Sequence, residues 1–121
     1  MSLKITPQQA AAMYDCLREF APFAGWKMPC AAKIEFRVLH TRRYDAAYQS
    51  YCHTRDIHGI DVSSARNGHF STLAMSMSHE MIHLRQRIAG TETPNTEHNA
   101  EFRRIAERIC RRFGFDPKQY I

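Results

Sequence analysis

The spacing of apolar residues predicts an amphipathic helix near the start of the chain. Thr6 is a typical helix cap, Pro7 suits the first helical position, and Gln9 occupies the place that completes a capping box. Apolar residues then recur every three or four positions, which is the period of one helical face. This stripe comprises Ala10, Met13, Tyr14, Leu17, Phe20 and Ala21. Pro22 is expected to end the helix.

Alternating patterns in the next section predict strands. Over 33–40, Ile34, Phe36 and Val38 alternate with charged residues, as in a half-buried strand. Two further strands are expected over 48–54 and 57–62, joined near Arg55 and Asp56. The sequence Arg66-Asn67-Gly68 is typical of a turn.

Two more helices are expected in the second half of the chain. One covers 70–89 and ends at Gly90, with a core stripe of Leu73, Met77, Met81, Leu84 and Ile88. Met75 and Ile82 lie beside this stripe, so we expect the helix to be covered on more than one side. The last helix is expected from about residue 96 to residue 113, capped by Asn95 or Thr96 and closed by Gly114. Its inner face comprises Phe102, Ile105, Ala106, Ile109 and Phe113.

These elements indicate an α+β fold: an N-terminal helix, a small three-stranded sheet, antiparallel or mixed, and two C-terminal helices. A length of 121 residues suits a single domain over 1–121. No apolar run approaches the length of a membrane span, so no membrane partner is expected. The first seven residues lack the apolar stretch of a secretory signal, which makes the cytoplasm the expected location.

The spacing of the cysteines and the net charge limit the kinds of metal site and partner that are expected. Cys16, Cys30, Cys52 and Cys110 form no Cys-x-x-Cys pair, which excludes a zinc ribbon and favours reduced thiols. The formal charge of +5 comes mostly from arginine and suits an anionic partner such as nucleic acid.

The most informative motif is His79-Glu80-Met81-Ile82-His83. On a helix, two histidines four residues apart lie about 40° apart around the axis and roughly 6 Å apart along it. They can therefore share one tetrahedral zinc ion. Glu80 projects beside them, where it can take a proton from a water molecule activated by the metal.

A catalytic zinc ion usually has three protein ligands, so a third is needed. Glu97, His98 and Glu101 are the candidates after the motif. Four residues before Phe102, His98 falls in the inward stripe of the expected last helix, and the short loop makes the two helices neighbours. We therefore predict His79, His83 and His98 as ligands and Glu80 as general base. A hydrogen-bonded core role for His98, and a ligand or ligand-orienting role for Glu101, remain open.

The segment 78–102 resembles the SprT-like metallopeptidases, which include Spartan-type proteases. That family carries a His-Glu-x-x-His helix followed by a His-Gly-x-x-Phe motif, matched here by His98-Asn99-Ala100-Glu101-Phe102. The resemblance implies a zincin-like fold, His98 as third zinc ligand, and proteolysis of proteins crosslinked to DNA. Asn99 replaces the usual glycine, and the zinc ribbon that often follows this domain is missing.

The expected reaction is peptide-bond hydrolysis with one Zn²⁺ and a protein or peptide substrate. The residue that stabilises the oxyanion is open among Tyr51, His58, Arg66 and His69. Extended substrates of zinc proteases commonly pair with a strand edge, for which the 57–62 strand is the expected candidate.

Arginines dominate the outer face of the expected last helix, with Glu107 the one acid among them. They are either a solvated surface or a set of DNA phosphate contacts: Arg103, Arg104, Arg108, Arg111 and Arg112.

Two alternatives to a general endopeptidase remain open. One is a protease that cleaves a single regulator, and the other is a basic nucleic-acid-binding or interaction domain whose catalysis has lapsed. The intact Glu80 argues against the latter.

Overall fold

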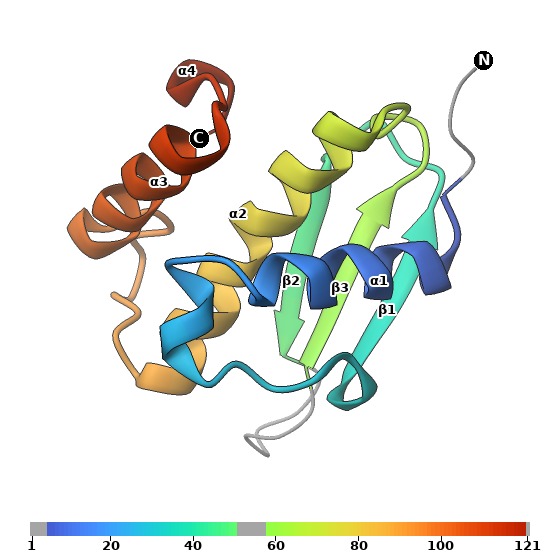
Figure 1. Ribbon diagram of the computed structural model, residues 1–121. Helices are drawn as coiled ribbons and strands as arrows, with labels where there is room; N and C mark the ends of the chain where they lie inside the picture. The colour runs from blue at the N-terminus through green and yellow to red at the C-terminus, as the bar shows by residue number, and fades with distance from the viewer. Residues whose placement is uncertain (1–4, 51–57, 121) are drawn as a thin grey trace.

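The computed structural model describes residues 5–50 and 58–120 and shows an α+β arrangement with a mixed sheet (Figure 1). The helices among these residues are α1 (Pro7–Arg18), α2 (Phe70–Ala89), α3 (Ala100–Phe113) and α4 (Pro117–Tyr120). Two short 3₁₀ helices, η1 (Phe23–Trp26) and η2 (Ala31–Lys33), join α1 to the sheet. The strands are β1 (Ile34–Leu39), β2 (Ala46–Ser50) and β3 (His58–Ser63). The expected α+β class is therefore confirmed.

The sheet has the order β1-β3-β2, so the last strand in sequence lies in the middle. β3 pairs in parallel with β1 and antiparallel with β2, and every residue of β3 is buried. The expectation that the 57–62 strand forms an edge is therefore wrong. β2 is instead the edge that packs against α2. Residues 51–57, which include Tyr51, the part 51–54 of the expected 48–54 strand and the expected connection near Arg55 and Asp56, lie outside the described residues.

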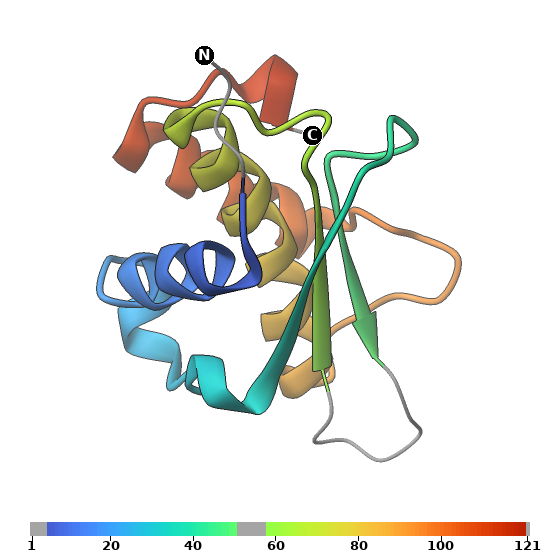
Figure 2. The same ribbon diagram turned by 90° about the vertical axis from the view of Figure 1, so that its right-hand side faces the viewer.

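Helices α1 and α2 cover the same face of the sheet, and α3 packs on the far side of α2 (Figure 2). α2 thus contacts α1, the sheet and α3, which confirms the expected central, covered helix. Ile88 is the exception to its core stripe, with 46% exposure in the last turn. Gly90 ends α2 in the left-handed conformation, as expected.

The first helix begins as expected but ends earlier. Thr6 and Gln9 form the capping box, with both reciprocal hydrogen bonds present. The helix ends at Arg18, not near Ala21, and the side chain of Phe20 is 40% exposed. Pro22 offers no backbone N–H and disfavours helical geometry at the residue before it, so the chain turns and inserts Phe23 into the core.

The last long helix starts later than expected, because Asn99 is its cap. The Asn99 side-chain oxygen accepts a hydrogen bond from the Phe102 N–H, 2.9 Å away. Its amide nitrogen donates to the Thr91 carbonyl and the Thr93 hydroxyl. These bonds hold the preceding segment as a folded loop, so residues 96–99 are not helical. The inner face of α3 is buried as expected, apart from a half-buried Phe113.

No helix within residues 5–50 and 58–120 is long and apolar enough to cross a membrane. Of the cysteines placed there, Cys16 and Cys30 are exposed free thiols and Cys110 is a buried one.

Candidate metal centre

Three imidazoles converge at the junction of α2 and the turn that precedes α3. His79 and His83 are one helical turn apart on α2, and their rings lie 5.3 Å apart. The His98 ring lies 4.9 Å from His79 and 5.4 Å from His83. One nitrogen of each histidine lies within 4.8 Å of the others, a spacing at which a single ion could be bound by all three.

His98 reaches the pair by a route that differs from the expected one. It precedes the cap residue Asn99 and is not part of α3, so the expectation that it lies in the inward stripe of that helix is wrong. Its ring instead stacks on Phe102, with centroids 4.2 Å apart. Phe102 is fully buried and also touches the other two histidines. The Phe102 ring near the start of α3 therefore packs against all three imidazoles.

An unsatisfied nitrogen marks the position where a ligand would bind. Among the described residues, His98 Nε2 is the one buried side-chain nitrogen or oxygen without a hydrogen-bond partner. Leaving such a group unpaired costs about 1–3 kcal/mol. A metal ion would use its lone pair, so the donor set fits zinc chemistry.

All three imidazoles favour the neutral form that binds metals. Burial, followed by the proximity of His83, lowers the pKa of His79 to about 4. Burial also lowers the pKa of His83 to about 4, and it lowers the pKa of His98. Neutral imidazole keeps one nitrogen lone pair for a cation.

Tyr120 on α4 orients the first of these histidines. The Nδ1 of His79 lies 2.8 Å from the Tyr120 carbonyl oxygen, which only accepts hydrogen bonds, so Nδ1 carries the proton. Nε2 is left unprotonated for the metal, as in other sites where a carbonyl orients a histidine ligand. Tyr120 is itself fixed, because it is buried and its hydroxyl lies 2.9 Å from the Ser78 hydroxyl.

Glu80 lies next to the histidines and is also buried. Its Oε2 is 3.9 Å from His79 Nε2, and its carboxyl group accepts a hydrogen bond from the Tyr48 backbone N–H of β2. Burial raises the pKa of Glu80 to about 8, and the Tyr48 N–H partly opposes this rise. A carboxyl group with a pKa near neutrality is suited to accept and return a proton.

The centre opens into a cleft of about 770 Å³. His79, Glu80, His98 and Tyr120 are among the residues that line it. Ala46 of β2 and the residues Arg42, Asp45 and Arg66 also line it. His83 faces a smaller neighbouring depression beside the loop 92–97.

The backbone of β2 has hydrogen-bonding groups that are not used by β3. The Asp45 carbonyl accepts from the Ser63 N–H of β3, so in the antiparallel alternation Ala47 and Gln49 also bond to β3. The N–H and C=O groups of Ala46 and Tyr48 consequently point away from β3. The Tyr48 N–H bonds Glu80, and Ala46 lines the cleft.

The remaining sequence candidates fall into distinct places. Glu101 accepts a hydrogen bond from Gln86 at 2.9 Å and stands outside the histidine group. Gln86 also bonds Asn99, so Glu101 braces the turn that carries His98. Among the oxyanion candidates, Arg66 lines the cleft. His58 is buried on β3 against the Tyr48 hydroxyl, and His69 is the exposed cap of α2.

The arginines of α3 are exposed, as expected. Arg103 lies near the centre, because its Nε donates to the His98 carbonyl at 3.3 Å. The others line two shallow depressions that share no residue with the cleft: Arg104, Arg108, Arg111 and Arg112. Sequence reasoning missed Tyr120, Tyr48 and Arg42 as parts of the site.

No protein-family model matches the sequence, and no curated protein matches it significantly.

Proposed function

We propose that the protein is a zinc-dependent metalloendopeptidase with a zincin-like fold, in keeping with its sequence resemblance to the SprT-like metallopeptidases. The observation that carries the proposal is the meeting of three neutral imidazoles beside a buried carboxyl group at a cleft. Three protein ligands leave a coordination position open, which is typical of catalytic and not of structural zinc.

Each residue of the centre has a role in this reaction. His79, His83 and His98 would hold the ion, and Tyr120 keeps the donor nitrogen of His79 correctly oriented. Zinc in such a site acts as a Lewis acid that activates water and polarises a carbonyl group. Glu80 accepts the proton of the attacking water and then returns it to the leaving amide nitrogen.

The edge of β2 is the proposed site for the substrate backbone. An extended peptide can add to an unpaired strand edge through main-chain hydrogen bonds. Ala46 offers an outward N–H and C=O within the cleft. This placement corrects the expectation that the 57–62 strand would serve, since both sides of β3 are already paired.

The deciding experiment compares wild type with Glu80→Gln after zinc content is measured by elemental analysis. We expect both proteins to bind one zinc ion, and casein hydrolysis to fall at least about a hundredfold in the variant. Equal hydrolysis by both would disprove the role of Glu80. Zinc binding without hydrolysis of casein or peptides by wild type would favour a regulator-specific protease or a binding domain.

A second proposed property is electrostatic contact with DNA through α3. Four exposed arginines gather on a surface separate from the cleft, so a bound phosphate backbone would leave the cleft accessible. Binding of a DNA duplex should weaken steeply with salt, and reversing Arg108 and Arg112 to glutamate should reduce that slope. A salt-independent affinity would contradict this contact.

A further inference from the structure

The cleft contains charged residues that the proposed reaction does not use. Arg42 and Asp45 belong to the loop between β1 and β2, and Arg66 belongs to the loop between β3 and α2. All three line the same cleft as Glu80 and Ala46. They therefore lie along the path that an extended substrate on β2 would follow.

The carboxylates of this cleft are already engaged. Asp45 forms an ion pair with Arg66 Nε, and Glu80 accepts from the Tyr48 N–H. Within the part of the chain that the structure describes, the guanidinium of Arg42 has no ion-pair or hydrogen-bond partner. Arg42 is exposed, and its positive charge is not paired with a carboxylate of the described cleft residues.

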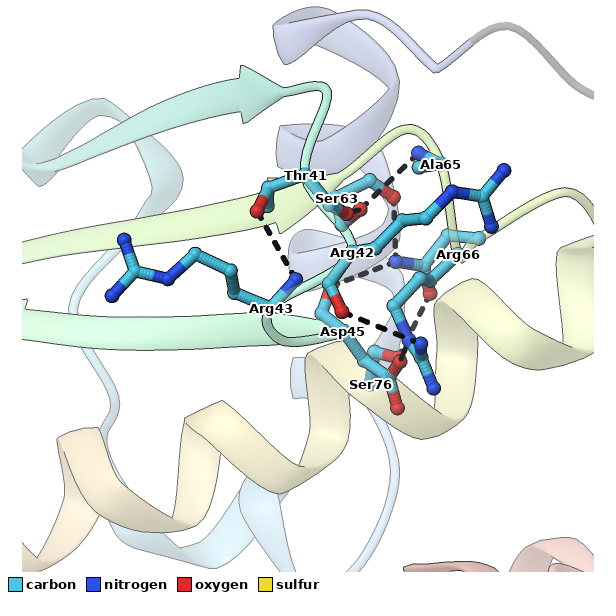
Figure 3. Close-up of polar contacts among 9 residues, drawn as sticks. Thr41, Arg42, Arg43, Asp45, Ser63, Ala65, Arg66 and Ser76 are labelled. Atoms are coloured by element: carbon cyan, nitrogen blue, oxygen red, sulfur yellow. Dashed lines mark hydrogen bonds and ion pairs between the residues drawn. The ribbon is translucent and has the colours of Figure 1, made fainter.

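The two loops form a fixed frame under these arginines. Arg66 Nη1 donates to the Arg42 carbonyl at 3.5 Å, and the Ser63 hydroxyl donates to the Thr41 carbonyl. Asn67 is fully buried and donates to the carbonyls of Asp45 and Ser63, both at 2.8 Å. Figure 3 shows this network joining the two loops. The backbone of the loop that carries Arg42 is therefore held by hydrogen bonds to the carbonyls of Thr41, Arg42 and Asp45.

The same frame is tied to the helix that carries the histidines. Asn67 Oδ1 accepts from the Ser76 hydroxyl at 2.8 Å, and Ser76 lies one turn before His79 on α2. Movement of the loops relative to the metal centre is thus restrained. The backbone that carries Arg42 is held in this way, whereas its unpartnered side chain would become ordered only when it binds a substrate group.

We propose that Arg42, supported by Arg66, forms a specificity subsite for a carboxylate of the peptide substrate. The inference rests on the proposed peptidase function and names its preferred substrate class: peptides with a carboxylate near the scissile bond. An Asp or Glu side chain and a free C-terminal carboxylate present the same chemistry to a guanidinium.

The test uses fluorogenic peptide mixtures of random sequence with one position fixed in turn as Glu, Gln or Lys. Each mixture is made with a free and with an amidated C-terminus. We expect zinc-loaded wild type to hydrolyse one Glu-fixed, amidated set about tenfold faster in kcat/KM than its Gln counterpart. If the free terminus supplies the carboxylate, the preference should instead follow the unamidated sets.

Arg42→Glu should abolish that preference and shift it towards the Lys-fixed set, while Arg42→Lys should retain part of it. Arg43→Glu is the matched control, because it makes the same charge change on the same loop. Figure 3 shows the Arg43 side chain extending in the opposite direction from that of Arg42, and Arg43 does not line the cleft. Arg43→Glu should leave the preference unchanged.

A binding measurement separates this inference from the proposed function. Labelled peptides of the same sets are titrated onto zinc-loaded Glu80→Gln protein, with and without Arg42→Glu, by fluorescence anisotropy. Selective binding that Arg42→Glu removes supports the subsite even if wild type cleaves nothing. Equal hydrolysis rates and equal binding for the Glu-fixed and Gln-fixed sets would overturn the inference. An effect of Arg43→Glu as large as that of Arg42→Glu would overturn it too.

Discussion

At the scale of single residues, the proposed centre depends on His98, the one member of its histidine group that α2 does not supply. Its unpaired Nε2 and its stacking on Phe102 are what single it out from Glu97 and Glu101. The carboxylate of Glu101 has a different role, because it accepts a hydrogen bond from Gln86. The two residues should therefore respond differently to substitution.

His98→Ala should lower zinc affinity by more than about a hundredfold. Loss of a residue that only orients a ligand typically lowers metal affinity by roughly 10–100-fold. Competition with a chromogenic chelator measures this affinity. Glu101→Ala is the comparison, with a loss within that smaller range. Equal losses in the two variants would contradict the assignment of His98 as ligand.

Glu80 should make the metal-free protein sensitive to alkaline pH. Its folded pKa, about 8, lies above the ordinary value of 4.5, so the folded state holds the proton more tightly than the unfolded state. This contribution to stability is complete below pH 4.5 and is lost as pH rises towards 8. Urea unfolding in the presence of a chelator should therefore show a free energy of unfolding that falls from pH 6 to 9.

Glu80→Gln has no carboxyl group to ionise, and its unfolding free energy should be flatter over the same range. The difference between the two curves isolates Glu80 from the other titrating groups. Parallel curves for wild type and variant would show that Glu80 ionises as freely in the folded as in the unfolded state.

At the scale of elements, α4 supports the centre although it is a single turn. It places the Tyr120 carbonyl against His79, and the Tyr120 side chain anchors it to Ser78. Chain truncation after Gln119 should lower zinc affinity about 10–100-fold and change the visible spectrum of the Co²⁺ form. Ser78→Ala is the control, because it removes the hydroxyl contact and keeps the carbonyl. An unchanged spectrum after truncation would rule out the orienting role.

The secondary-structure elements differ in how well the sequence predicts them. The motif on α2, its end at Gly90 and the inner face of α3 follow from local patterns and were predicted. The central place of β3 was not, because strand order depends on pairing between distant segments. Nor could the sequence indicate Tyr120, which acts through a backbone carbonyl that every residue possesses.

At the scale of the whole molecule, the centre joins α2 to the loop and helix that follow it. A metal ion bound there would stabilise the folded protein, since unfolding separates the ligands. At a free zinc concentration 100 times Kd the gain is about 2.7 kcal/mol, which corresponds to roughly 10 °C in Tm for a chain of this size.

Calorimetry with and without zinc measures this shift. The double variant His79→Ala, His83→Ala should show no zinc-dependent change in Tm, and magnesium should not replace zinc in the wild type. A full shift in the double variant would place the stabilising ion elsewhere.

The stacking of His98 on Phe102 offers a way to watch the centre directly. The Phe102 ring touches all three imidazoles, so its aromatic protons experience their ring currents. Any rotation of these imidazoles on ion binding would change the NMR shifts of that one phenylalanine. A specifically labelled Phe102 would then report ion occupancy in the absence of turnover, and paramagnetic Co²⁺ would broaden the same signals.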